Sequence, residues 1–393
     1  MRKNDGVNLP KRWEVRKLGE VLTIERGGSP RPIEKFLTDS PDGINWIKIS
    51  DATASNKYIF ETKEKINKES LHKTRIVHEG DFILSNSMSF GRPYIMKTTG
   101  CIHDGWLVLK QNGNKIFEAE FLYYLLSSPY VFTQFDYLAA GSTVRNLNIA
   151  LVSSVQVPIP LLPEQRRIVS ILDKCFAIID KAKANAEQNL KNVREVFESY
   201  LQGVFGGGNW EMKTLNQISE NLDSKRVPIT KNKRQSGKIP YYGASGIVDY
   251  VADYIFNEDL LCISEDGANL LARTYPIAFS ISGKTWVNNH AHVLRFPNLI
   301  TQKFVELYIN SIKIDGYVSG MAQPKLNQAM LNKIPIPYPP LSKQQSIVRQ
   351  LDALRAETQR LEAVYRKKII GLEELKKSIL QKVFSGELTK KEK

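Results

Sequence analysis

The sequence has little of what marks several large classes of protein. Among its 393 residues there are only three cysteines, Cys101, Cys175 and Cys262, and none has CxxC spacing. The sequence therefore predicts neither a zinc site nor a disulfide framework, and we expect buried thiols. No run of about 18 apolar residues is present, and the opening residues lack the apolar core of a signal peptide. We expect a cytoplasmic protein that does not span a membrane.

Catalytic motifs are also missing. The stretch SGKTW, at residues 282–286, contains the GKT of a phosphate-binding loop, but the glycine that such a loop needs further upstream is Ala278. No GxGxxG loop is present for a dinucleotide or a methyl donor. The pair Pro339 and Pro340 lacks the preceding asparagine of the NPP[YF] signature of amino-methyltransferases. The sequence thus predicts no catalytic role for this chain.

Two pairs of side chains could still suggest chemistry. His290 and His292 alternate along a predicted strand and could share a metal, but no third ligand is near them in the sequence. Glu265 and Asp266 could suggest a nuclease carboxylate pair, but no Glu-x-Lys follows at a suitable spacing. Polar contacts or core packing are the favoured roles of the histidines, and we expect the two acids to be solvated in a loop.

Basic residues outnumber acidic ones. The 55 lysines and arginines, against 41 aspartates and glutamates, give a formal charge of +14 at pH 7. Such an excess favours a polyanionic partner. Because no transmembrane or lipidation signal is present, nucleic acid is favoured over a membrane surface.

Apolar residues recur at steps of four and three between residues 163 and 206, which predicts one long helix with a heptad seam. The same pattern returns 179 residues later, in residues 342–385. Asn189 and Lys368 occupy matching seam positions, and such polar interruptions can fix the register of paired helices. An ordinary buried helix is the alternative interpretation. The first seam consists of Ile168, Leu172, Cys175, Ile179, Ala182, Ala186, Val193, Val196 and Tyr200.

The repeat extends beyond the helices. The segment Leu9–Val21 (LPKRWEVRKLGEV) matches Asn209–Ile218 (NWEMKTLNQI). The two copies agree without a gap from Leu147 to Gln202, whereas they barely agree between residues 27 and 141. Ser342 and Gln345 have the spacing of a capping box at the start of the second long helix. A frame that is kept while the globular segments differ indicates a tandem repeat of globular segment and helix.

We predict an α/β fold for each globular segment. The second segment starts where the first helix ends and finishes where the second helix begins, so we expect the helices to pair antiparallel. Equivalent antiparallel helices have a two-fold axis across their middle. We therefore expect two globular domains at opposite ends of a two-helix coiled coil, related by pseudo-two-fold symmetry. Predicted strands are Ile44–Ile49, Asp81–Ser85, Trp106–Lys110, Leu260–Ser264 and His292–Phe296, and predicted helices are Glu118–Ser128 and Thr301–Ile312.

Polar, glycine-rich loops suited to DNA occur in both segments. Arginine can read guanine, asparagine or glutamine can read adenine, and serine, threonine and lysine hold phosphates. Each loop alone fits an ordinary turn equally well, but their repetition in two segments of a basic chain favours DNA binding. The loops are Glu25–Pro32, Ser85–Arg92 and Gly141–Asn146 in the first segment, and Ile239–Gly246, Ser264–Asn269 and Gly320–Lys325 in the second.

Together these motifs resemble the DNA specificity subunit of type I restriction-modification systems, over nearly the whole chain. The resemblance is carried by LPKRWEVRKLGEV at Leu9–Val21, by PIPLLPEQRRIVSILD at Pro158–Asp173 with its copy at Pro335–Asp352, by the helix endings Tyr200–Phe205 and Ile379–Leu388, and by IPYYGASG at Ile239–Gly246.

The resemblance implies a non-catalytic subunit. Two target-recognition domains are expected to read the two halves of an asymmetric, bipartite double-stranded DNA sequence, with the paired helices as a spacer ruler. The expected partners are two modification subunits, which carry S-adenosylmethionine and methylate adenine, and restriction subunits that act as motor and nuclease. No cofactor is expected on this chain. The alternatives are a self-sufficient methyltransferase or nuclease and a structural coiled-coil adaptor.

The predicted boundaries follow from the repeat. The first target-recognition domain is expected at residues 1–157, the first spacer helix at 158–208, the second target-recognition domain at 209–335, and the second spacer helix with its tail at 336–393. The candidate DNA-binding residues are Arg26, Ser29, Arg31, Asn86, Ser87, Arg92, Arg145, Asn146, Tyr241, Tyr242, Ser245, Asn269, Lys284, Gln323 and Lys325.

Overall fold

The computed structural model describes residues 9–10, 12–87, 89–111, 113, 115–140, 145–320 and 322–388. Predictions that concern residues 141–144, Met88, Met321 and the two chain ends therefore lie outside the described residues. The chain forms two compact units, one of residues 1–185 with 367–393 and the other of residues 186–366. Each unit contains one globular segment and part of each long helix.

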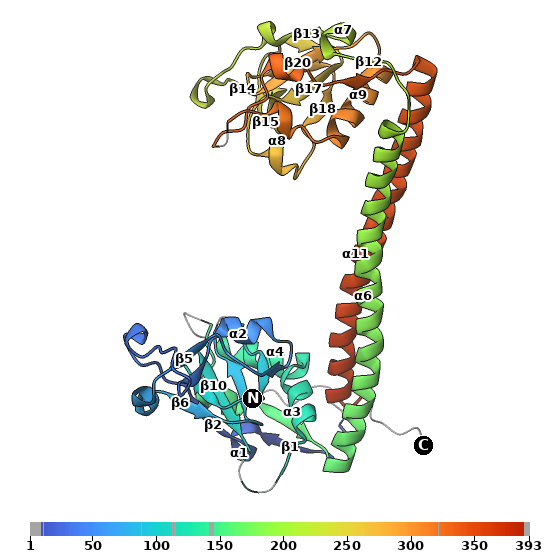
Figure 1. Ribbon diagram of the computed structural model, residues 1–393. Coiled ribbons are helices and arrows are strands. Elements are labelled where there is room, and N and C mark those ends of the chain that lie inside the picture. The colour runs from blue at the N-terminus through green and yellow to red at the C-terminus, as the bar shows by residue number, and fades with distance from the viewer. Residues whose placement is uncertain are drawn as a thin grey trace. The chain divides into compact units, whose positions relative to one another are not determined.

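The globular segment of the first unit is built on three small sheets (Figure 1). One has five strands in the order β2-β10-β7-β8-β4, one has four in the order β5-β3-β9-β6, and β1 pairs with β11. The strands are β1 Glu14–Lys17, β2 Thr23–Arg26, β3 Ile44–Ile47, β4 Tyr58–Ile59, β5 Glu64–Ile66, β6 Arg75–Val77, β7 Phe82–Ser85, β8 Pro93–Met96, β9 Gly100–Ile102, β10 Trp106–Lys110 and β11 Gln156–Ile159. The helices are α1 Leu18–Val21, α2 Ile49–Ala54, α3 Ala119–Leu126, α4 Pro129–Ala139 and α5 Ile149–Ser154.

The globular segment of the second unit also has three sheets. Their orders are β13-β20-β17-β18, β15-β14-β19-β16 and β12-β21. The strands are β12 Met212–Lys213, β13 Glu220–Asn221, β14 Ser236–Gly243, β15 Gly246–Val251, β16 Phe256–Asn257, β17 Leu260–Ser264, β18 Ala278–Ile281, β19 Lys284–Val287, β20 Ala291–Arg295 and β21 Ile336–Pro337. The helices are α7 Leu215–Ile218, α8 Asn269–Ala272, α9 Leu299–Ser311 and α10 Gln328–Leu331.

The topology of the two segments repeats. The order β13-β20-β17-β18 reproduces β2-β10-β7-β8, and the antiparallel pair β12-β21 reproduces β1-β11. Both sheets are covered by a helix that follows the last strand, α3 in one segment and α9 in the other, and Phe121 and Phe304 are buried at matching places in these helices. The prediction of an α/β tandem repeat is therefore confirmed.

Two long helices complete the units. Helix α6 spans Leu162–Gly206 and α11 spans Leu341–Phe384. At 1.5 Å per residue, each is about 65 Å long. In the first unit Lys183 pairs with Glu373 and Asp180 pairs with Lys376, so residue numbers fall along one helix as they rise along the other. The helices are antiparallel there, as predicted.

The second unit shows the same direction of pairing. Arg194 Nε lies 3.0 Å from Glu362 Oε1, and the Tyr200 hydroxyl donates to Gln350 Oε1 at 3.0 Å. At the end of α6, the ring of Phe205 packs edge-on against Phe304 in α9, with 5.4 Å between ring centroids. The helix is thus packed onto the globular segment that follows it in the chain.

The predicted heptad seam of α6 is only partly covered near its end. Val196 is 58% exposed and Tyr200 is 39% exposed, whereas the neighbouring side chains Phe197 and Leu201 are half-buried. The side chains of an ideal α-helix drift by about 20° per heptad relative to a strict seven-residue repeat. A drift of this kind moves the covered face by one residue.

The polar interruptions lie outside the covered face as well. Asn189 and Lys368 are exposed, and the next residues, Leu190 and Ile369, are half-buried instead. The prediction that polar residues interrupt the seam is therefore wrong. The shift occurs at equivalent positions of the two copies, which is a further sign of the repeat.

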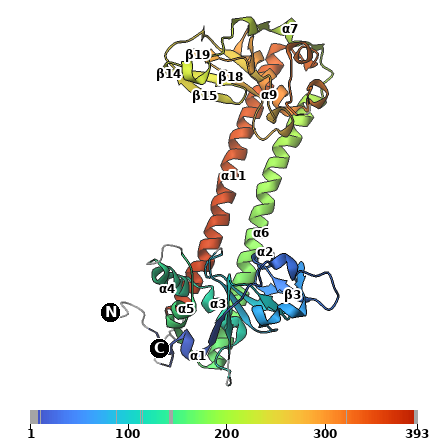
Figure 2. The same ribbon diagram turned by 90° about the vertical axis from the view of Figure 1, so that its left-hand side faces the viewer.

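A buried glutamine fixes the start of each long helix. Gln165 Nε2 donates to the carbonyl oxygens of Pro160 at 2.8 Å and Ile116 at 2.9 Å, and its Oε1 accepts from the backbone N–H of Glu118 at 2.8 Å. These contacts attach α6 to the segment before α3. Both views place α3 beside the first turns of α6 (Figure 2), where the Tyr124 hydroxyl donates to Asp173.

Gln344 has the same role at the start of α11. Its Nε2 donates to the carbonyl oxygen of Pro339 at 2.8 Å, and its Oε1 accepts from the Thr301 hydroxyl at 2.9 Å. Because α11 already begins at Leu341, Ser342 lies inside the first turn. The predicted capping box of Ser342 is therefore wrong.

The prediction of buried thiols is confirmed for two of the three cysteines. Cys101 and Cys262 are buried and Cys175 is half-buried, and burial raises the pKa of the Cys101 thiol to about 11. Among the described residues, no helix combines the length and the apolar character needed to cross a membrane.

Candidate nucleic-acid interface

Three chain segments of the first domain meet at one edge of the five-stranded sheet. Strands β2 and β7 end there and β10 begins there, since Trp106 pairs with Ser85 and Leu107 pairs with Arg26. The residues that follow these strand ends are therefore brought together. They include the loop after Arg26, the loop that begins at Asn86, and Asp104.

Asp104 organises this edge. Its backbone oxygen accepts from Arg26 Nε at 3.0 Å and from Asn86 Nδ2 at 2.8 Å. Its carboxylate accepts from the Ser29 hydroxyl at 2.6 Å and pairs with Arg31 at 3.2 Å. The Ser29 hydrogen bond, aided by Arg31, lowers the pKa of Asp104, which therefore remains charged. Four of the predicted residues thus contact Asp104, two at its backbone oxygen and two at its carboxylate, and the sequence did not single out this aspartate.

Two further predicted arginines lie on aromatic rings. Arg92 lies over the ring of Tyr94, 5.1 Å from its centroid, and Arg145 lies 4.2 Å from the centroid of Phe90. Arg145 also pairs with Asp136. Both guanidinium groups remain exposed, so each is held in place while its charge faces solvent.

The equivalent edge of the second domain carries a cluster of ion pairs. Glu265, which directly follows β17, lies 2.7 Å from Arg226 Nη1 and 3.2 Å from Lys325 Nζ. Arg226 also donates to the carbonyl oxygen of Ala291 at 2.7 Å. Lys325, one of the predicted residues, is therefore held by a carboxylate at the base of the site.

His292 forms the buried floor of this cluster. Its Nε2 lies 2.7 Å from the carbonyl oxygen of Leu326, and its Nδ1 lies 2.6 Å from Asp223 Oδ2. Burial alone would raise the pKa values of Asp223 and Glu265. The hydrogen bond from His292 to Asp223, and that from Arg226 to Glu265, outweigh this effect, so both pKa values are lowered.

The same residues are the group with metal-ligand potential in the described part of the chain. Ligand atoms of Asp223, Glu265 and His292 all lie within 4.8 Å of one another. Both ring nitrogens of His292 are already hydrogen-bonded, and Arg226 and Lys325 place two positive charges on Glu265. This donor set fits an ion-pair network better than a cation site.

The expectation that Glu265 and Asp266 are solvated loop acids is wrong. Only 13% of the Glu265 side chain and 19% of the Asp266 side chain are exposed. Asp266 Oδ2 lies 2.7 Å from His290 Nδ1. His290 and His292 thus make polar contacts with carboxylates, which was the favoured interpretation of these histidines.

Strands β14 and β15 bring further predicted residues to the second domain. Tyr241 is buried, and its hydroxyl accepts from the backbone N–H of Ile229 at 3.0 Å. Tyr242 stacks on Phe279 with 5.9 Å between centroids. Ser245 is exposed in the turn after β14, next to Ala244, whose carbonyl oxygen accepts from the Ser264 hydroxyl.

The predicted residues differ in how far they can reach solvent. Asn269 is buried, and its Oδ1 accepts from the backbone N–H of Thr274 at 2.9 Å, which closes the turn after α8. Lys284 is exposed above the ring of Tyr254. In total, Arg26, Arg31, Ser87, Arg92, Arg145, Ser245, Lys284, Gln323 and Lys325 are exposed, Ser29, Asn146 and Tyr242 are half-buried, and Asn86, Tyr241 and Asn269 are buried.

Sequence reasoning missed three residues of these edges: Asp104, Asp223 and Arg226. Asp223 and Arg226 could have been found by extending the match between the copies, because the offset that matches Trp13 with Trp210 also matches Arg26 with Asp223 and Ser29 with Arg226. The sequence carries no comparable signal for Asp104, since acids are common in loops.

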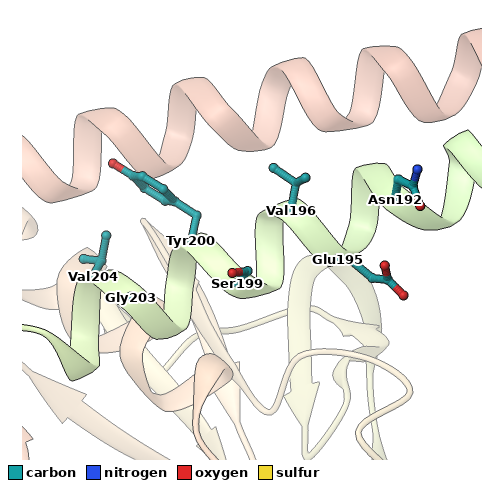
Figure 3. A pocket seen from close by; sticks show the side chains of 7 residues that line it. All are labelled: Asn192, Glu195, Val196, Ser199, Tyr200, Gly203 and Val204. Atoms are coloured by element: carbon teal, nitrogen blue, oxygen red, sulfur yellow. The ribbon is translucent and has the colours of Figure 1, made fainter.

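A separate open groove of about 780 Å³ lies on the second half of α6 (Figure 3). Val196 and Tyr200 point towards α11, whereas Glu195 points away from it. The groove is lined by Asn192, Glu195, Val196, Ser199, Tyr200, Gly203 and Val204.

Comparison with known proteins agrees with this geometry. The profile of the type I restriction modification DNA specificity domain matches residues 10–192 and again residues 207–370. A putative type I restriction enzyme specificity subunit of Haemophilus influenzae is 34% identical over 208 residues, which are 48% of this chain and 52% of that relative. The chain thus spans about half the length of this relative. The putative MjaX specificity subunit of Methanocaldococcus jannaschii is 25% identical, over 97% of this chain and 94% of that one.

Solved structures share the fold. A chain from a study of assembly and conformational transition of the type I R-M system has a TM-score of 0.78 at 18% identity and covers 97% of this chain and 99% of its own. The HsdS subunit of Thermoanaerobacter tengcongensis has a TM-score of 0.63 at 19% identity, over 98% and 100%. With two matched domains in tandem, the chain belongs to the family of type I restriction-modification DNA specificity subunits, the DNA-recognition component of these systems.

Proposed function

We propose that this chain reads a bipartite, asymmetric double-stranded DNA sequence, one half with each globular domain. The observation that carries the proposal is the repeated sheet edge, where the ends of β2 and β7, or of β13 and β17, collect cationic and amide side chains. The frame is the same in both domains but the side chains differ. Two different half-sites follow from that difference, because base edges are read by side chains.

The two long helices serve as the spacer between the half-sites. Support comes from their length of about 65 Å each and from their antiparallel pairing within each unit. A rod of fixed length would set how many unread base pairs separate the two halves of the target.

The chain also acts as a scaffold and carries out no chemistry itself. We assign methyl transfer to two modification subunits that hold S-adenosylmethionine, and translocation and cleavage to restriction subunits. Exposed apolar residues of the long helices, such as Ile178 in α6 and Ile370 in α11, are suited to contact a partner subunit.

The decisive experiment is methylome sequencing of a host that carries this chain with its modification subunit. A single bipartite motif is expected. Exchanging residues 210–333 for those of another specificity subunit should then change only the half-site read by the second domain. A change in both halves would contradict the modular assignment.

Salt titration separates this function from the alternatives. Binding that depends on phosphate contacts should weaken with a log-log slope of about −0.9 per contact. A structural adaptor would give no sequence-dependent binding. A self-sufficient enzyme would bind methyl donor or modify DNA as the purified chain alone.

A further inference from the structure

The end of β7 in the first domain holds buried polar atoms that have nothing to bond with. Across the described part of the chain, seven buried side-chain polar atoms lack a hydrogen-bond partner, and three of them are Ser85 Oγ, Asn86 Oδ1 and Asn146 Oδ1. Asn86 is only 2% exposed. A buried polar atom without a hydrogen-bond partner lowers the stability of the fold. Three such atoms at the end of β7 are therefore unusual.

The backbone joins these residues into one site. The N–H of Leu147 donates to the carbonyl oxygen of Asn86 at 2.9 Å, which brings Asn146 beside Asn86. The second domain repeats this bond, since the N–H of Leu326 donates to the carbonyl oxygen of Glu265 at 2.8 Å. Asn86 thus corresponds to Glu265, and Asn146 corresponds to Lys325.

Every equivalent side chain of the second domain has a partner. The hydroxyl of Ser264, the counterpart of Ser85, donates to the carbonyl oxygen of Ala244 at 2.5 Å. Glu265 is paired with Lys325 at 3.2 Å and with Arg226 at 2.7 Å. The side chains at these positions therefore have partners within the second domain, whereas their equivalents in the first domain leave three polar atoms without a hydrogen-bond partner.

The orientation of the Asn86 amide is fixed by chemistry. Its Nδ2 donates to the backbone oxygen of Asp104 at 2.8 Å, and a carbonyl oxygen can only accept. Asn86 Oδ1 is therefore a true acceptor without a donor. A metal cation is disfavoured at this place, because Arg26 and Arg31 are bound to the same Asp104.

In the major groove of DNA, the base groups that donate hydrogen bonds are the exocyclic amino groups of adenine and cytosine. We infer that Asn86, supported by Ser85 and Asn146, reads such an amino group in the half-site of the first domain. This rests on the proposed function and deepens it. The acceptors are covered in the free chain and receive their donor when DNA binds.

The test is analogue scanning of the first half-site with the intact complex. Once methylome sequencing has given the motif, each adenine is replaced by purine and each cytosine by 2-pyrimidinone, both of which lack the amino group. At one position the wild-type complex should lose about 5- to 100-fold in affinity, the range of a good base contact. Asn86→Ala should show this loss on unmodified DNA and no further loss on the analogue.

Two more variants keep the test independent of folding. Asn146→Ala removes an open acceptor without breaking the bond to Asp104, so it should reduce the amino-group dependence without lowering the melting temperature. Asn148→Ala is the matched control, since Asn148 only caps α5 through the backbone N–H of Leu151. It should leave the analogue pattern unchanged.

A further variant introduces the Glu265–Lys325 ion pair of the second domain into the first domain. The double variant Asn86→Glu with Asn146→Lys recreates the Glu265–Lys325 pair in the first domain. It should abolish the amino-group dependence there and leave the second half-site unchanged. A preference in the first half-site that depends on no amino group, or that survives Asn86→Ala, would overturn this inference alone. Absence of any sequence preference would overturn the proposed function as well.

Discussion

Replacing Glu265 by glutamine tests whether the ion-pair cluster stabilises the second domain. Glu265 and Arg226 keep only 13% and 12% of their side chains exposed, and they lie 2.7 Å apart. Breaking a buried pair by removing one charge costs about 3–5 kcal/mol. Glutamine retains an acceptor oxygen, and Lys325 is 52% exposed and screened by solvent. We therefore expect a loss of about 2 kcal/mol at neutral pH.

The pH dependence gives the sharper result. The pKa of Glu265 is lowered by folding. Its contribution to stability is therefore present above the pKa of an ordinary glutamate, about 4.3. The contribution is lost as the pH falls through the lower value of the folded chain. The difference between wild type and Glu265→Gln should be full at pH 7 and should shrink below about pH 4.

Thermal unfolding followed by calorimetry measures this difference. A loss of about 2 kcal/mol corresponds to about 4–8 °C for a unit of this size. Glu357→Gln is the matched control, because Glu357 pairs with Arg360 on the surface at 2.6 Å and should change little. A difference for Glu265→Gln that stays constant from pH 7 to about pH 3 would refute the assignment of the stability to its charge.

Three further predictions concern the long helices. Gln344→Ala leaves the carbonyl of Pro339 without its donor and should cost about 2 kcal/mol in a denaturant titration, and Gln165→Ala should cost a similar amount. If either variant is neutral, the glutamine does not fix its helix. Arg194→Glu should cost about 0.5 kcal/mol, and adding Glu362→Arg should restore it in a double-mutant cycle, whereas additive losses would argue against the pair. Inserting one heptad at matching places of α6 and α11 lengthens each helix by about 10 Å. Methylome sequencing should then find the same half-sites, separated by a spacer that is about 3 base pairs longer. An unchanged spacer would contradict the role of the helices as a ruler.

The parts of the fold that depend on local pattern could be predicted from the sequence. Strands β10 and β17 have the predicted bounds, because both are continuous apolar runs that are buried on the sheet. Helix α6 begins one residue before the predicted start. The tandem repeat could also be predicted, because the similarity between the two copies lies in the sequence itself and does not depend on tertiary contacts.

The parts that depend on long-range contacts could not be predicted. Asp223 and His292 are far apart in the sequence, and only the pairing of β20 with β13 and β17 brings them together with Glu265. The covered positions of α6 shift from the predicted seam at Leu190 for a related reason, because this drift depends on the exact winding of the helix. Among the candidate DNA-binding residues, the loops were identifiable, but burial of Tyr241 and Asn269 was not.

The buried glutamines at the helix starts bear on how such a protein can change its target. Gln165 makes hydrogen bonds to main-chain atoms, at Pro160, Ile116 and Glu118, whereas Gln344 binds both the main chain at Pro339 and the side-chain hydroxyl of Thr301. The Gln165 joint recognises backbone and therefore places few demands on the side chains of the domain to which it is attached, whereas the Gln344 joint also requires a hydroxyl at position 301. On the proposed function, recombination at the Gln165 joint would exchange one domain for another while keeping these hydrogen bonds, and a single genetic event would then give a new half-site.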